Sequence, residues 1–396
     1  MTLLNWVLAV GLDIKGLILT VVGAIVGGVL KWLLDRNLIL ELGDRLEKSL
    51  TQSAEGETLL AQRELRIRQL EERLGAERIV VDTKETKLRA LLADLTDSET
   101  SLWTKFRKQP KFADHDVRIG KRHPIILTVA NLKGGVGKTT ITGNLIAYFD
   151  KRKKRVLAID LDYQGSLTTM LRDYGDVDER SSSVNKFFEL NASPKWLRQA
   201  TRGLGAQLPR SRLASAFYEF ARYEEYLMVE WLLQLGGDDL RYRLSGLLLH
   251  EDAGEEFDIV LIDVPPRLTT GTINALCAST HVIIPTVFTP LSAEPVANFV
   301  RMAKNLTSHL NPGLEFVGVL ETMSPKENEG QDVRAAAKQT ILEALQQTCP
   351  GMGILTCNVP RRVSIADAHL AGLDGNAEIK AIFNQVGKEI EQRVGL

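Results

Sequence analysis

The feature that most constrains the fold is a glycine-rich loop at residues 133–140, with the sequence KGGVGKTT. It follows a mostly apolar, uncharged run at 125–130, and a helical pattern continues from Thr139 to Phe149. Such an apolar run is typical of a buried parallel strand. A strand, a glycine-rich loop and a helix in this order predict a phosphate-binding loop.

The loop offers the groups that a nucleotide phosphate requires. Its glycines let backbone N–H groups approach phosphate oxygens, and the helix that follows adds partial positive charge at its N-terminus. Lys138 is expected to reach the β- and γ-phosphates, Thr139 to give its hydroxyl to Mg²⁺, and Thr140 to contact the α-phosphate. The predicted ligands are therefore ATP and Mg²⁺. The predicted phosphate-binding residues are Gly134, Gly135, Val136, Gly137, Lys138, Thr139 and Thr140.

Strand and helix patterns alternate from residue 125 to residue 396. This alternation predicts an α/β domain with a doubly wound, mostly parallel sheet. Apolar residues in the tail recur at helical spacing from Ile379 to Val394, as expected of a helix that packs on the sheet. Residues 170–256 are read as a helical insertion. The predicted strands are 125–130, 155–160, 258–263, 281–285 and 316–321.

The N-terminal segment, residues 1–40, differs from the rest of the chain. Residues 16–34 are 19 residues with Lys31 as their one charge, enough for a helix of roughly 28 Å against a bilayer core of about 30 Å. Lys31 and Arg36 make the C-terminal flank more basic than the side that carries Lys15, which predicts that this flank is cytoplasmic. A signal peptide and an interfacial or buried helix are the alternatives.

Residues 41–103 are charged and favour a helix. Apolar residues recur every seven positions, a pattern that predicts a helical coiled-coil stalk. The companion heptad position is charged at Arg63, Glu77 and Lys84, so a single amphipathic helix docked on the next domain is the alternative. Residues 104–124 hold seven Lys/Arg against two Asp and are read as a basic linker. The seven-residue repeat consists of Leu60, Ile67, Leu74, Val81, Leu88, Leu95 and Leu102.

Composition excludes several classes of protein. The chain has 49 Lys and Arg against 50 Asp and Glu, so it is no polycation. It has three cysteines and no CxxC pair, which excludes a disulfide framework and a cysteine-based metal site. One local patch is basic: residues 191–218 hold no acidic residue, and Trp196 lies among the basic ones. This patch fits non-specific DNA, a protein partner or an inert surface. Its basic residues are Lys195, Arg198, Arg202, Arg210 and Arg212.

Four segments together resemble the ParA/MinD family of P-loop ATPases, whose phosphate loop has a lysine before its first glycine, as Lys133 stands here. The segment 156–168 (VLAIDLDYQGSLT) resembles the family's second motif, with Tyr163 in place of a proline and Ser166 in place of an asparagine. The segments 257–276 and 359–368 resemble the Walker B strand with its switch region and the adenine loop. These motifs span residues 123–396, and Gln164-Gly165 after the paired aspartates favours the ParA branch.

The resemblance implies roles for individual residues. In the family the front lysine reaches across an ATP sandwich dimer to the partner's phosphates, and Lys133 matches it. Asp162 matches the residue that positions the attacking water, and Asp160 lies nearer the Mg²⁺ shell. Asp263 matches the Walker B aspartate. Lys133, Lys138 and Asp162 are thus the expected catalytic residues, with Thr139, Asp160 and Asp263 at the metal.

The resemblance extends to the late loop, and the sequence departs from the family pattern at residue 163. Pro360 and Arg361 match the adenine loop, where Arg361 is equally well an ordinary surface arginine. The missing proline at Tyr163 makes hydrolysis less secure than nucleotide binding, so slow turnover stimulated by a protein partner is expected. Iron–sulfur carriers of the superfamily are excluded by the missing CxxC, and tyrosine kinases by the absence of tyrosines after Tyr242.

The resulting hypothesis is a ParA-like ATPase that is tethered to a membrane and switches between monomer and ATP dimer to position or segregate cargo such as DNA. Its expected location is the bacterial inner membrane, with a single N-terminal span that contacts lipid and a cytoplasmic ATPase domain. Two alternatives stay open. The chain is a regulatory ATPase subunit of a multi-gene system such as phage defence, or a scaffold that binds ATP and hydrolyses it weakly.

Overall fold

The computed structural model describes residues 27–28, 40–41, 43, 45, 56–97, 103–104, 123–175, 183–190, 192–232, 239–289, 291–325, 331–362, 365 and 370–396. The chain divides into two compact units, Met1–Leu92 and Ala93–Leu396. The first is represented mainly by one long helix, and the second holds the sheet with its helices.

The long helix α3 spans Gly56–Asp97, 42 residues. It confirms a long helix where the seven-residue repeat predicts one. Its described side chains are mostly exposed, including Ile67 and Leu70, and the structure gives no support for the predicted coiled coil. Arg89 and Glu85 form an exposed ion pair one turn apart, which adds little stability.

The predicted location, a single span in the inner membrane, is corrected by the structure. Among the described residues, no helix is both long enough and apolar enough to cross a bilayer. The longest described helix, α3, carries charged residues along its whole length, and burying them in hydrocarbon would be costly. The apolar stretch 16–34, which motivated the prediction, lies outside the described residues apart from 27 and 28.

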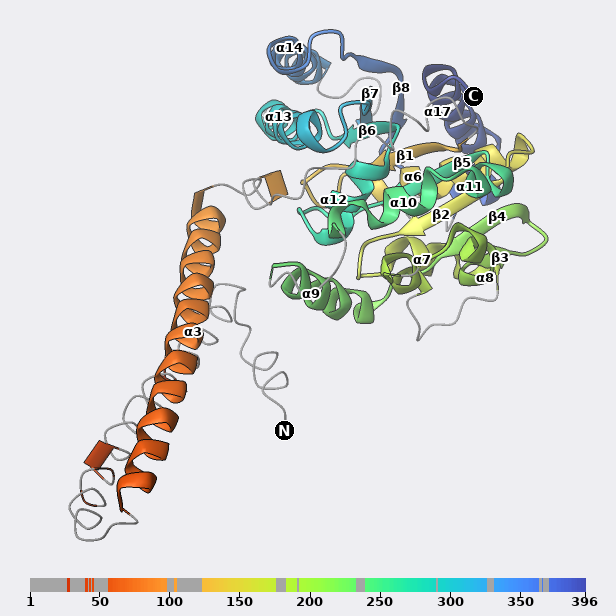
Figure 1. Cartoon of the computed structure of the whole chain (residues 1–396). Helices are drawn as coiled ribbons and strands as arrows, with labels where there is room; N and C mark the ends of the chain where they lie inside the picture. The colour runs from red at the N-terminus through yellow and green to blue at the C-terminus, as the bar shows by residue number, and fades with distance from the viewer. Residues whose placement is uncertain are drawn as a thin grey trace. The chain divides into compact units, whose positions relative to one another are not determined.

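The second unit is built on an eight-stranded sheet in the order β3-β4-β2-β5-β1-β6-β7-β8 (Figure 1). All neighbouring strands are parallel except β3 and β4. The described part of the chain thus confirms the predicted doubly wound, mostly parallel fold. The strands are β1 (Ile125–Val129), β2 (Val156–Asp160), β3 (Arg202–Leu204), β4 (Leu208–Ala214), β5 (Ile259–Asp263), β6 (His281–Thr286), β7 (Glu315–Ser324) and β8 (Ile354–Pro360).

Helices cover both faces of the sheet because side chains alternate along each strand. On β1, Leu127 and Val129 join a core with α6 and α17, whereas Thr128 bonds Ser279 at the end of α12 on the other face. The first layer comprises α6 (Lys138–Lys151), α7 (Ser166–Leu171), α16 (Ala371–Asp374) and α17 (Ala377–Val394). On the other side lie α10 (Arg243–Leu248), α12 (Thr270–Ala278) and α13 (Ala293–Leu310), with α14 (Gln331–Thr348) beside α13.

The last helix confirms the prediction made from its apolar spacing. In α17 the buried face includes Ile379, Phe383, Val386 and Ile390. A Cβ at Gly387 would lie 2.3 Å from the Tyr148 ring, so α17 and α6 pack too closely there for any other residue.

The prediction of a helical insertion at 170–256 is wrong in part. The segment 170–256 does contain α8 (Leu197–Ala200), α9 (Tyr218–Leu232), α11 (Glu251–Glu256) and 3₁₀ turns at 172–174, 183–188, 194–196 and 240–242. It also supplies β3 and β4, which extend the sheet beyond β2. Arg210 and Arg212 both lie within the seven residues of β4. The strand therefore has no continuous apolar run, and the sequence pattern does not predict it.

The second unit also includes a residue that lies before its first strand. Trp103 is 2% exposed and stacks on Trp231 of α9, with ring centroids 5.4 Å apart. The buried guanidinium of Arg241 donates to the Trp103 carbonyl, lies over the Trp231 ring and pairs with Asp239. The folded unit therefore takes in part of the stretch that the sequence assigned to the stalk.

Replacing Trp103 tests the importance of this anchor. Trp103→Ala should reduce the free energy of unfolding by about 3–5 kcal/mol, because a large buried ring leaves a cavity. Trp196→Ala is the matched control, since Trp196 is 46% exposed, and should cost no more than roughly 1 kcal/mol. Urea unfolding of the full chain, followed by circular dichroism, measures both. Equal midpoints for the two variants would contradict the assignment.

Candidate nucleotide site

The loop between β1 and α6 has the backbone that its glycines predict. Gly135 and Gly137 have φ of 70° and 83°, values that a residue with a Cβ rarely adopts. Gly137 is the N-cap of α6 and has no side chain to cap the helix. The first N–H groups of α6 are thus left for a ligand, and the helix dipole favours an anionic one.

Two residues that sequence reasoning missed hold this loop in place. Asn131 accepts from the N–H of Lys133 at 3.0 Å and donates to the Pro285 carbonyl at 2.9 Å. Thr322 of β7 donates to the carbonyl of Val136 at 2.9 Å. Both side chains are buried, so the loop is fixed to β6 and β7 on one side. Their positions after β1 and inside β7 carry no local signal in the sequence.

The two loop lysines differ in their surroundings. The ammonium group of Lys138 is buried and donates to the Lys133 carbonyl at 3.2 Å. Burial lowers the pKa of Lys138, while the nearby carboxylates of Asp263 and Asp162 oppose that change. Lys133 is exposed, as are Gly134 and Gly135 beside it. Lys138 thus points into the site, and Lys133 lies on its outer side.

Asp263 and Thr139 form the part of the site that suits a divalent cation. Thr139 Oγ1 donates to Asp263 Oδ2 at 2.6 Å. Asp263 Oδ1 is buried and has no hydrogen-bond partner. Burial raises the pKa of Asp263 to about 7, although Thr139 and Lys138 favour its charged form. An orphaned carboxylate oxygen beside a hydroxyl fits the oxygen ligands that Mg²⁺ prefers.

The two aspartates after β2 have separate environments. Asp160 is fully buried and pairs in register with Asp263; its oxygens accept from the Asp162 N–H and from both the N–H and hydroxyl of Thr168. Burial raises the pKa of Asp160 well above its usual value, and Asp263 adds to the effect. Asp162 is half-buried, and its Oδ1 accepts from the Gln164 N–H at 3.0 Å. Asp160 therefore organises the loop that presents Asp162.

Most of the predicted site residues lie at one edge of the sheet. β2, β5 and β1 are adjacent, so Asp160, Asp263 and the phosphate loop meet at their carboxyl ends. Pro360 ends β8, farther along the same edge, and the N–H of Arg361 donates to the Ser324 carbonyl of β7. The roles of Pro360 and Arg361 at an adenine ring stay a prediction, as do the metal contacts of Asp160.

The insertion contributes a buried carboxylate that sequence reasoning missed. Glu224 of α9 is 6% exposed and accepts from the Gly271 N–H of α12 at 2.5 Å. Burial raises the pKa of Glu224 to about 7; Asp162 adds to the rise, and Arg267 opposes it. A glutamate within the amphipathic pattern of α9 gives no sequence signal of burial. In the fold it connects the insertion to the switch segment after Asp263.

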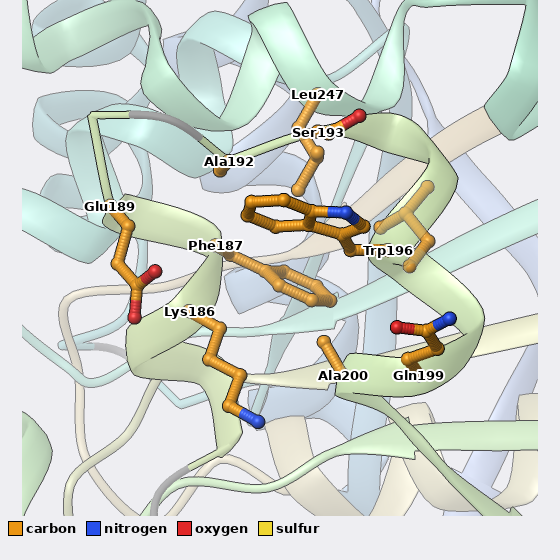
Figure 2. A pocket seen from close by; sticks show the side chains of 10 residues that line it. Lys186, Phe187, Glu189, Ala192, Ser193, Trp196, Gln199, Ala200 and Leu247 are labelled. Atoms are coloured by element: carbon orange, nitrogen blue, oxygen red, sulfur yellow. The ribbon is translucent and has the colours of Figure 1, made fainter.

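A pocket of about 260 Å³ lies elsewhere, against the basic patch (Figure 2). Trp196 and Phe187 line it, with Lys186 and Glu189 also contributing to its wall. None of its lining residues belongs to the phosphate loop. Within the patch, Arg198 pairs with Glu256, and Arg212 donates to the Thr201 carbonyl. The patch also contains three exposed basic residues, Lys195, Arg202 and Arg210.

Comparisons with known proteins identify relatives of this chain. A family model described as an AAA domain matches residues 125–316. The chromosome-partitioning ATPase Soj of Thermus thermophilus is 31% identical over 243 residues, which cover 61% of this chain and 83% of Soj. The chromosome partitioning protein ParA of Caulobacter vibrioides is 29% identical over 249 residues, with coverage of 61% and 83%.

A solved structure adds a nucleotide complex to the comparison. Cobyrinic acid a,c-diamide synthase of Mycobacterium smegmatis, with bound ATP analog and magnesium, is 26% identical with a TM-score of 0.52. The match covers 67% of this chain and 93% of that one.

The buried Glu224 predicts a pH dependence of stability. Its pKa is about 7 in the folded state against 4.5 ordinarily, so its favourable contribution is present below about pH 4.5 and is lost as pH rises through about 7. Glu224→Gln keeps an acceptor for Gly271 but does not titrate. At about 1.4 kcal/mol per pH unit, the variant should gain up to roughly 3 kcal/mol over wild type across this range.

Urea unfolding at pH 5, 6, 7 and 8 measures that difference. Glu225→Gln, at the exposed neighbouring position of α9, is the matched control. If the difference in the free energy of unfolding between Glu224→Gln and wild type stays constant with pH, the pKa of Glu224 is not raised by burial in the folded protein.

Proposed function

The chain belongs to the ParA family of P-loop ATPases, and from this premise we propose that it is an ATP-dependent dimerisation switch that partitions a cargo. The observation that carries the proposal is the meeting of the two-lysine loop with Asp162 and Asp263 at one sheet edge. Such a site suits phosphoryl transfer, in which catalysis consists mainly of positioning and charge stabilisation.

ATP binding is assigned to the loop and the first turn of α6. Backbone N–H groups from Gly134 to Thr140 would surround the phosphates, and Lys138 would supply a buried positive charge. Thr139 and Asp263 would hold Mg²⁺, which when bound supplies positive charge to the phosphate oxygens. The orphaned oxygen of Asp263 supports this assignment.

Dimerisation is assigned to the exposed Lys133. Because its side chain lies on the outer side of the loop, it is available to the phosphates of a second copy of the chain. Hydrolysis is assigned to Asp162, which would orient the attacking water beside the γ-phosphate. Turnover is proposed to be slow and stimulated by a protein partner, since Tyr163 departs from the family pattern.

DNA is proposed as the cargo, because relatives are described as chromosome-partitioning proteins. The exposed Lys195, Arg202 and Arg210 offer a surface for its phosphates. A scaffold that binds ATP and hydrolyses it only weakly is the competing function, and measurements of turnover separate the two.

The two loop lysines should differ when each is removed. Lys138→Ala should abolish ATP binding, because the phosphates lose the buried cation. Lys133→Ala should bind ATP almost as wild type but fail to form the ATP dimer. Calorimetry measures binding and light scattering measures mass. A Lys133→Ala protein that dimerises with ATP as wild type does would disprove the cross-dimer role.

Removing the proposed water-positioning group should separate binding from hydrolysis. Asp162→Ala should bind ATP, dimerise and remain closed, with hydrolysis about 10²-fold slower in single turnover at saturating Mg²⁺. Wild-type hydrolysis rates in this variant would assign the water to another group. Wild type without turnover in the presence of DNA would favour the scaffold.

A further inference from the structure

The loop that carries Asp162 is a tight turn held by its own hydrogen bonds. The N–H of Asp162 donates to Asp160 Oδ1 at 3.0 Å, and its carbonyl accepts from the Gly165 N–H at 2.8 Å. Gly165 has φ of 63°, and a Cβ there would lie 2.7 Å from the Ala216 carbonyl oxygen. The base of the turn is thus fixed against the segment that enters α9, while Tyr163 follows Asp162 directly.

The Tyr163 side chain packs between two other segments. The Arg267 guanidinium carbon lies 4.9 Å from the Tyr163 ring centroid, a cation–π distance. The Tyr218 ring meets Tyr163 edge to face, with centroids 6.3 Å apart and planes at 75°. Arg267 belongs to the switch segment after Asp263, and Tyr218 begins α9. One aromatic ring therefore joins the loop of Asp162 to both.

The partners of Tyr163 are themselves anchored. Arg222, one turn along α9, lies over the Tyr218 ring at 5.7 Å. The Arg267 carbonyl accepts from the Thr272 hydroxyl at 2.8 Å, which ties the switch segment to α12. Glu224 holds the adjacent Gly271 N–H from α9. The loop of Asp162, the switch segment and α9 are thus linked by both side-chain and backbone contacts.

We infer that Tyr163 and Arg267 are positioning residues: their ring–guanidinium contact fixes the loop that presents Asp162 against the switch segment. The inference rests on the proposed ATPase function. In the family pattern a proline occupies this position, and its ring fixes the backbone covalently. Here the loop lacks that restraint, and packing of the Tyr163 ring takes its place.

A double-mutant cycle in the full chain tests the contact. Tyr163→Ala and Arg267→Ala should each lower kcat about 10-fold, because a misplaced group loses alignment with its reactant. KM for ATP should stay within about twofold of wild type. The double variant should be no slower than the slower single variant, since both remove one contact. Tyr163→Phe should keep the wild-type rate, because its ring still offers a π face.

Arg301→Ala is the matched control, since Arg301 is exposed on α13 and bonds Asn298 instead of the loop. The ATP dimer of each variant is measured by light scattering and should form as in wild type. Losses that multiply in the double variant would overturn the inference, as would Arg267→Ala at the wild-type rate or a variant that fails to dimerise. A wild type without turnover overturns the proposed function itself, and the inference with it.

Discussion

The rest of the site depends on the burial of Asp263 and Lys138 beside each other at the end of the central strands. Each charge is removed from water, so each would prefer to be neutral, and their proximity keeps both charged forms accessible. Thr139 takes one oxygen of Asp263 and leaves the other unpartnered. A protein interior does not leave such an oxygen without cause. A ligand that brings both a cation and an anion, such as a magnesium nucleotide, would fit this arrangement.

Hydrogen bonds to the surrounding backbone help to position this buried pair. The sheet places β5 next to β1, and Asn131 and Thr322 attach the phosphate loop to β6 and β7. The carboxylate of Asp160 accepts hydrogen bonds from backbone N–H groups in the turn after β2. Residues that are not predicted ligands, such as Asn131 and Thr322, thus help to decide where the ligands lie, and the insertion extends this support through Glu224 to the N-terminus of α12.

The local sequence pattern predicts much of the fold but few of these supporting contacts. Buried parallel strands are apolar throughout, and the glycine loop has one geometry, so both are visible in the sequence. β4 was missed because Arg210 and Arg212 interrupt its apolar pattern, although in the folded unit Arg212 donates to the Thr201 carbonyl. Trp103 and Glu224 were missed because their burial depends on residues more than a hundred and about fifty positions away. Such contacts are properties of the assembled fold, and no periodicity encodes them.

The turn at Tyr163 shows how one substitution changes what a loop depends on. Proline restrains φ through its own ring, so a loop that contains it is stiff whatever surrounds it. An aromatic side chain restrains the backbone only while its neighbours remain in place, here Arg267 and Tyr218. The geometry of Asp162 is thereby tied to α9, whose outer face exposes Tyr218, Tyr226 and Val229. A displacement of α9 would carry Tyr218 away from the Tyr163 ring and remove part of the packing that holds the loop of Asp162.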